Sequence, residues 1–121
     1  MPRVARTLAN MAIEIQPDSG GRVAVARLAT DPQFTADLES IGQLDLSRPS
    51  SVVLDFAGVR HINSSNLSRL LRLRKRLIQA DGKLILCNLP AQVASVFQVT
   101  GLDRVFNFAA DVDEALTAGR P

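Results

Sequence analysis

The regular pattern of apolar and polar residues begins near residue 11 with two short stretches. Apolar and polar side chains alternate through residues 11–15, the sequence PDSGG follows, and residues 22–28 form a second apolar-rich stretch. Alternation with a period of two is typical of β-strands, and glycines such as Gly20 and Gly21 favour a tight turn. The pattern therefore predicts an N-terminal antiparallel hairpin.

Helical spacing replaces alternation after this hairpin. Phe34, Leu38 and Ile41 lie at steps of four and three, which places them on one face of a helix. A proline suited to a first helical turn precedes them, and the candidate N-terminal cap is Thr30 or Asp31. The segment predicts a helix of about three turns.

Strands and helices alternate from residue 51 to the end. The β-branched run SVVLDF, residues 51–56, is apolar almost throughout, which suits a strand covered on both faces at the centre of a sheet. Such alternation is typical of parallel strands joined by right-handed crossovers, so we expect an α/β fold with a mixed sheet of about five strands and about four helices. The later expected elements are strands at 83–89 and 104–108 and helices within 60–78, 90–101 and 111–118.

The segment RHINSSNLSRLLRLRKRLI, residues 60–78, combines the clearest helical pattern with most of the candidate chemistry. Its apolar residues recur at steps of three, four and seven, as one helical face requires. We expect this face to pack on the core. The predicted stripe consists of Leu67, Leu70, Leu71, Leu77 and Ile78.

Two adjacent serines, Ser64 and Ser65, lie where this helix is expected to begin. One interpretation is structural: Asn63 or Ser64 caps the helix, because a side-chain oxygen there accepts a hydrogen bond from an otherwise unpaired backbone N–H. The other is functional, because a hydroxyl in the first turn is exposed near the positive end of the helix dipole, where it can accept a phosphate. The two interpretations are compatible.

A basic stripe follows the serines on the same helix. Arg69, Arg72 and Arg76 fall on one side, with Arg74 and Lys75 flanking them. The simplest interpretation is a solvated face opposite the leucines. An acidic protein partner and nucleic-acid phosphates are the alternatives, and nucleic acid is the weaker one because the chain has no Trp or Tyr to stack on bases.

Composition and length limit the classes of protein to which the chain can belong. A length of 121 residues suits one domain, and 46% hydrophobic with 21% charged residues is typical of a globular protein. The formal charge of +2 comes from 14 basic against 12 acidic residues, so any basic function has to be local. There is no secretory signal and no run of about 18 apolar residues, so we expect a cytoplasmic protein without membrane insertion.

Metal, redox and hydrolytic chemistry find little support. A single cysteine, Cys87, cannot form an intrachain disulfide and is expected in the core, and one histidine, His61, makes no metal cluster. A hydrolase triad of Asp55, His61 and Ser64 is not expected, because no G-x-S-x-G turn exposes the serine. We therefore expect no enzymatic activity, no cofactor and no metal.

Three stretches together resemble a STAS domain of the bacterial anti-sigma factor antagonist type: VVLDFAGVRHINSSNLSRLLRLRKRL, DGKLILCNLP and VFQVTGLDRVF. Members of this family read D-S-S/T-G-L at the start of a helix and F-x-x-T-G-L before the last strand. The second motif is present at residues 97–102. In the first, Asn63 replaces the family aspartate and Asn66 the family glycine, which is expected to remove a negative charge and to add a side chain to the docking face.

The resemblance implies a STAS fold over residues 11–118, with the helices packed mainly on one face of the sheet. Residues 1–10, which show no clear period, are expected to be an extension prone to fraying, and residues 119–121 a tail. The implied partner is an anti-sigma factor that is also a serine kinase. It phosphorylates Ser64, with Ser65 as second choice, and so releases itself; a phosphatase would reverse the step. The implied partner-binding residues are Asn63, Ser64, Ser65, Asn66, Leu67 and Arg69.

A second hypothesis has a different mechanism. The chain is also similar to the STAS scaffold subunits that dock on lipid-transport ABC systems, where no phosphate cycle is needed. The asparagines in place of the family aspartate and glycine favour this alternative.

Overall fold

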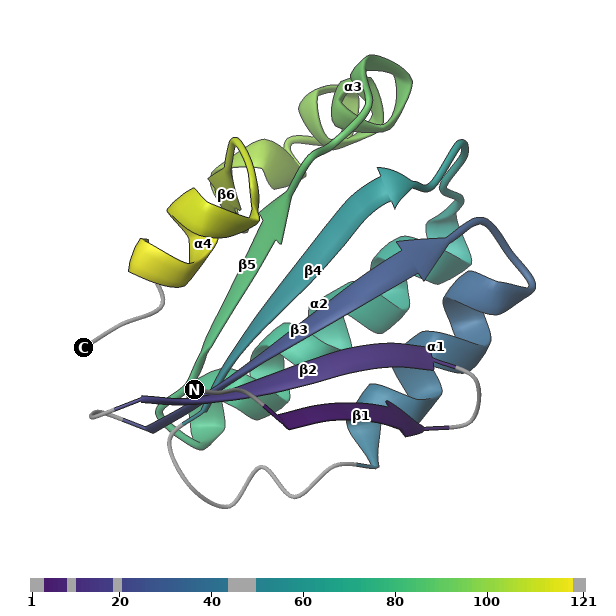
Figure 1. Cartoon of the computed structure of the whole chain (residues 1–121). Helices are drawn as coiled ribbons and strands as arrows, with labels where there is room; N and C mark the ends of the chain where they lie inside the picture. The colour runs from purple at the N-terminus through teal and green to yellow at the C-terminus, as the bar shows by residue number, and fades with distance from the viewer. Residues whose placement is uncertain (1–3, 9–10, 19–20, 44–49, 119–121) are drawn as a thin grey trace.

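The computed structural model describes residues 4–8, 11–18, 21–43 and 50–118 (Figure 1). The predicted turn residue Gly20 and the tail at 119–121 lie outside this part of the chain. The described residues form one sheet with the strand order β1-β2-β3-β4-β5-β6. The strands are β1 (Val4–Leu8), β2 (Met11–Asp18), β3 (Gly21–Ala29), β4 (Ser50–Gly58), β5 (Lys83–Cys87) and β6 (Asn107–Ala109).

The sheet contains both strand orientations. β1 pairs with β2, and β2 with β3, in antiparallel register, whereas β3, β4, β5 and β6 run parallel. Six strands replace the predicted five, because β1 forms within the stretch expected to be an extension. Its sequence VARTL carries no strong pattern, and the strand is defined by its backbone pairing with β2, where Val4 lies opposite Ile15.

The described part of the chain forms four α-helices, as predicted. They are α1 (Gln33–Gly42), α2 (Ser64–Gln79), α3 (Ala91–Thr100) and α4 (Val112–Ala118), and a short 3-10 helix, η1 (Leu102–Arg104), follows α3. α3 ends at Gly101, whose φ of 78° lies in the left-handed region. Glycine adopts this conformation without strain, so it is suited to end the helix.

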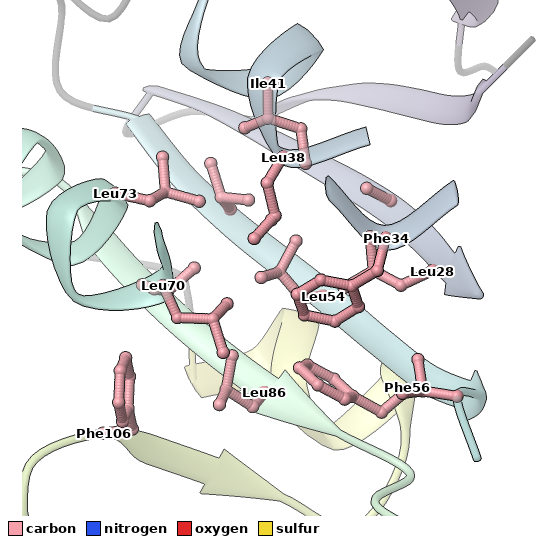
Figure 2. Packing of buried hydrophobic residues seen from close by; sticks show 14 of the residues in the cluster. Leu28, Phe34, Leu38, Ile41, Leu54, Phe56, Leu70, Leu73, Leu86 and Phe106 are labelled. Carbon is pink, nitrogen blue, oxygen red and sulfur yellow. The ribbon is translucent and has the colours of Figure 1, made fainter. Parts of the chain in front are cut away.

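β4 lies at the centre of the core, and its side chains alternate between the two faces of the sheet. Val52, Leu54 and Phe56, each at most 1% exposed, belong to the cluster formed with α1, α2 and α3 (Figure 2). Val53 points to the opposite face, where it clusters with Ala115 of α4. Three helices therefore contribute to the cluster on one face, whereas α4 packs on part of the other, next to β5 and β6 (Figure 1).

α2 packs on this core with a stripe that differs in part from the predicted one. Leu71 and Ile78 are 37% and 49% exposed, whereas Leu73, which the pattern left out, is 4% exposed. Successive helical residues are about 100° apart, so a residue one position beyond the stripe turns toward its edge. The predicted members that are buried are Leu67, Leu70 and Leu77.

Candidate functional site

The loop between β4 and α2 is anchored to the end of β3 and to the residue that follows it. Gly58 lies so close to β3 that a Cβ there would be 2.9 Å from the carbonyl oxygen of Leu28, which leaves room only for glycine. Val59 is buried, and the backbone N–H of Arg60 donates to Thr30 Oγ1 at 2.8 Å. The backbone that leads into α2 is therefore held in one position.

The first turn of α2 is closed by a reciprocal pair of asparagines. Asn63 is the N-cap residue, and its Oδ1 accepts from the backbone N–H of Asn66 at 2.9 Å. Asn66 Oδ1 in turn accepts from the backbone N–H of Asn63 at 3.0 Å. Such a capping box satisfies backbone donors that the helix itself cannot pair. Of the two predicted caps, the structure selects Asn63 and leaves the Ser64 hydroxyl out of the capping bonds.

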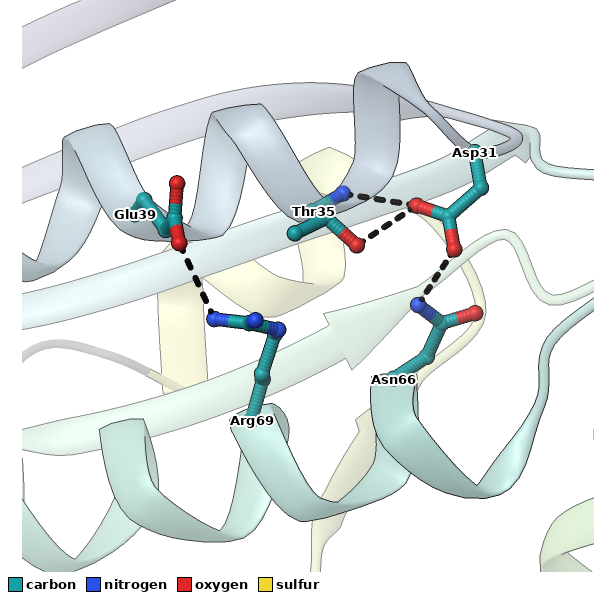
Figure 3. Close-up of polar contacts among 5 residues, drawn as sticks. All are labelled: Asp31, Thr35, Glu39, Asn66 and Arg69. Carbon is teal, nitrogen blue, oxygen red and sulfur yellow. Dashed lines mark hydrogen bonds and ion pairs between the residues drawn. The ribbon is translucent and has the colours of Figure 1, made fainter.

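Asp31, just before α1, ties this turn to a second helix (Figure 3). Its Oδ2 accepts from Asn66 Nδ2 at 2.9 Å, and its Oδ1 accepts from the backbone N–H and the hydroxyl of Thr35 at 2.9 and 2.7 Å. These hydrogen bonds, with that from Asn66 the strongest influence, hold the pKa of Asp31 below its ordinary value. The charged carboxylate lies at the start of α1, where the helix dipole favours it.

The two serines face outward from this fixed turn. Ser64, Ser65 and Asn63 are exposed, whereas Asn66 is 1% and Leu67 8% exposed. The expectation that Asn66 adds a side chain to the docking face is therefore wrong, because its hydrogen bonds to the cap and to the α1 carboxylate turn it inward. Asn66 and Leu67 support the surface from beneath. We refer to residues 63–65 as the serine turn.

The basic stripe borders α1. Arg69 Nη1 lies 3.2 Å from Glu39 Oε2, and Arg76 donates to the backbone carbonyl of Gly42 at the end of α1 (Figure 3 shows the first pair). Arg72, between them, forms no hydrogen bond or ion pair with a described residue. Two members of the stripe thus bind the neighbouring helix, and the third is left for solvent or a partner.

Sequence reasoning missed Asp31 and Thr35 as parts of this site. Asp31 was expected only as a cap of its own helix, and its bond to Asn66 spans 35 positions, which leaves no periodic signal. The strand order gave one indication that Asp31 and Asn66 lie close together. The two residues follow adjacent parallel strands, β3 and β4, and the carboxyl ends of such strands lie at the same edge of a sheet.

The other candidate residues serve the fold. Asp55 Oδ1 accepts from the backbone N–H of Ala57 at 2.9 Å and from Asn88 Nδ2 at 3.1 Å, and neither bond involves His61, which is exposed. Burial, reinforced by nearby carboxylates, raises the pKa of the Cys87 thiol to about 12, so the thiol stays protonated. Across the described ranges, no three His, Cys, Asp or Glu side chains gather as a metal site requires.

Within the part of the chain that the structure describes, no helix is both long enough and apolar enough to cross a membrane.

Comparison with known proteins identifies the family of this fold and site. The family model described as the STAS domain matches residues 6–115, so the chain belongs to the STAS domain family. The chain is 36% identical over 94 residues to BtrV of Bordetella bronchiseptica, a protein to which the role of anti-sigma factor antagonist is assigned. The match covers 78% of each protein.

Solved structures share the fold at lower identity. A Thermotoga maritima protein with the same assigned role superposes with a TM-score of 0.70 at 15% identity, over 98% of this chain and 95% of that one. An anti-sigma factor antagonist from Mycobacterium paratuberculosis gives a TM-score of 0.69 at 22% identity, over 96% and 100%. At these identities the likeness shows the fold alone.

Proposed function

We propose that this protein is an anti-sigma factor antagonist that binds a partner anti-sigma factor through the serine turn. Family membership and the 36% identity to a relative with that assigned role support the proposal. The observation that carries it is the exposure of Ser64 and Ser65 on a turn that the buried Asn66 holds through the capping box and through its bond to Asp31. Arg69, with 30% of its side chain exposed, would contribute at the edge of the same surface.

A fixed turn suits recognition, because a partner that binds it has little backbone left to order. The loop before the turn is anchored through Thr30, and the turn itself is closed by the capping box. A modification at this surface would therefore change the chemistry of the serine hydroxyls and leave the backbone path as it is.

Phosphorylation is the proposed release step. The partner, acting as a serine kinase, transfers the γ-phosphoryl group of ATP to Ser64 Oγ; ADP leaves, and a base of the kinase takes the hydroxyl proton. The product carries a charge of roughly −2 in a contact shaped for a neutral hydroxyl, which weakens binding. A hundredfold loss of affinity corresponds to about 2.7 kcal/mol. A phosphatase would restore the bound state.

Two features near Ser64 favour this position as the acceptor. It is the first residue of α2, where the helix dipole stabilises a phosphate. Its side chain is also exposed, and the capping bonds use Asn63 and Asn66, so the Ser64 hydroxyl is not engaged in them.

The test is incubation of the protein with ATP and the cognate kinase from its genome of origin, followed by mass spectrometry. We expect a single phosphate on Ser64 in the wild type and in Ser65→Ala, and none on the protein in Ser64→Ala. The proposal of release by phosphorylation fails if Ser64 stays unmodified while the same kinase preparation still binds the protein.

The scaffold function remains the second candidate, favoured by the replacement of the family aspartate by Asn63. It predicts binding to a transporter complex that does not depend on modification of Ser64. Genes beside this one discriminate the two: a kinase or phosphatase supports the regulatory function, whereas a permease with an ATPase supports the scaffold.

A further inference from the structure

A groove of about 190 Å³ lies between α1 and α2, beyond the serine turn. Leu38 of α1 and Leu73 of α2 line it as apolar residues, 5% and 4% exposed. Glu39 lies on the α1 side, where Figure 3 shows it opposite Arg69. The α2 side is formed by Arg69, Arg72 and Arg76. We call this site the arginine groove.

The positive charge of the chain is concentrated on α2. This helix contains five basic residues and no acidic one, whereas the whole chain has a formal charge of +2, so the remainder carries a net charge of −3. Arg69 and Arg72 are three positions apart, and Arg72 and Arg76 are four apart. Like charges at these spacings face each other and weaken a helix, and an anion between them relieves the repulsion.

The hydrogen-bonding capacity of the groove is only partly used. Arg69 holds Glu39 through Nη1, while its buried Nε has no partner among the described residues. Arg72 is exposed and unpaired in the same part of the chain. A guanidinium can hold a carboxylate through two parallel N–H···O bonds, and neither arginine makes such a pair here. The exposed guanidinium of Arg72 therefore offers the groove's accessible free donors for a carboxylate.

We propose that the arginine groove binds an acidic segment of a protein partner, whose carboxylates pair with the arginines while an apolar side chain rests on Leu38 and Leu73. The positive charge of the groove favours an acidic partner. The apolar surface of Leu38 and Leu73 favours a peptide with apolar side chains over a nucleic-acid phosphate backbone. The volume lies below the roughly 300 Å³ at which small-molecule pockets begin. Among the residues that line the groove there is no aromatic ring on which a base could stack.

This groove is centred away from the serine turn, although Arg69 lies between the two and borders both. Arg72 follows Ser64 by eight residues, which is about 12 Å along the helix axis. The inference therefore goes beyond the proposed function: an acidic segment can occupy the groove whether or not Ser64 is phosphorylated, and a partner can use either surface alone.

The test is titration of the isotope-labelled protein, followed by NMR at low salt, with a synthetic peptide of alternating glutamate and leucine residues. Its control peptide carries glutamine in place of glutamate. Two charge-reversal variants are compared: Arg72→Glu in the groove and Lys75→Glu on the same helix outside it. We expect shifts at residues 38–42 and 69–76, an affinity about tenfold lower for Arg72→Glu, and a change within about twofold for Lys75→Glu.

Three results would overturn the proposal: no shifts with the acidic peptide, equal losses in both variants, or equal binding of the control peptide. A short DNA duplex is titrated in parallel. If the duplex binds more tightly than the peptide and Arg72→Glu abolishes its binding, the groove is a nucleic-acid site and the proposal is wrong. Unchanged backbone spectra of both variants outside the groove exclude unfolding as the cause of a loss.

Discussion

The first turn of α2 and its middle turns both contact α1, but by different chemistry. At the first turn, the buried amide of Asn66 donates to Asp31 at 2.9 Å. At the middle turns, the guanidinium of Arg69 meets Glu39 at 3.2 Å, and the side chain of Glu39 is 58% exposed. The first contact fixes geometry and leaves neutral hydroxyls outside, whereas the second leaves cationic groups available.

Because the two contacts differ in burial and charge, one helix can present two different recognition surfaces. A buried amide that bonds to two neighbours contributes to stability and holds a turn in place, because its removal breaks both bonds and leaves a gap beneath the turn. An exposed ion pair contributes little to stability and is easily exchanged for another partner. The proposed switch lies on the rigid contact, and the proposed acidic-peptide site lies on the exchangeable one.

The largest expected effect comes from truncating a buried leucine that packs α2 on the core beneath both regions. Leu70 is 0% exposed, and Leu70→Ala should lower the free energy of unfolding by about 2–5 kcal/mol, since it removes apolar burial and leaves a cavity. Leu71→Ala, at a position 37% exposed, is the matched control and should cost less than about 1 kcal/mol. Urea denaturation followed by circular dichroism measures both, and equal losses would contradict the observed orientation of α2.

The next effect separates the two contacts with α1. Asn66→Ala removes half of the capping box and the bond to Asp31, so it should cost about 1–3 kcal/mol. Glu39→Gln removes only the exposed ion pair and should cost less than about 1 kcal/mol. The same denaturation experiment compares them. A larger loss for Glu39→Gln than for Asn66→Ala would reverse the comparison.

The smallest expected effect is the pH dependence of the Asp31 contact. Folding lowers the pKa of Asp31 from its ordinary value of 3.8, so the charged form contributes stability above that pH and loses it as the pH falls through the folded-state pKa. The stability difference between the wild type and Asp31→Asn should therefore shrink as the pH falls below 3.8. Burial raises the pKa of Asp37, which gives the opposite trend, but both chains contain this residue. A difference that stays constant with pH would remove the assigned role of the carboxylate.

Local signals predicted much of this molecule. The cap at Asn63 and the buried Cys87 both depend on short-range patterns, and the structure confirms them. β1 escaped prediction because its pairing with β2 defines it more than its own residues do. Leu73 lies between Arg72 and Arg74, yet it is three residues after Leu70 and four before Leu77, so helical spacing does place it on the buried face; the predicted stripe left out this signal.

The candidate site was predictable only in its outer part. The sequence placed Ser64 and Ser65 at a helix start, which is a local property. It could not assign the inward role of Asn66, because that role depends on Asp31, a residue brought close only when β3 and β4 pair in parallel. Side chains that act through tertiary contacts leave no trace in local spacing.

We propose that a phosphate on one exposed hydroxyl, that of Ser64, decides whether the partner binds. Isothermal titration of the cognate anti-sigma factor into the wild type, Ser64→Ala and Ser64→Asp tests it most directly. We expect equal binding by the wild type and Ser64→Ala and an affinity about a hundredfold lower for Ser64→Asp, equivalent to about 2.7 kcal/mol. Equal affinity for all three proteins would contradict it.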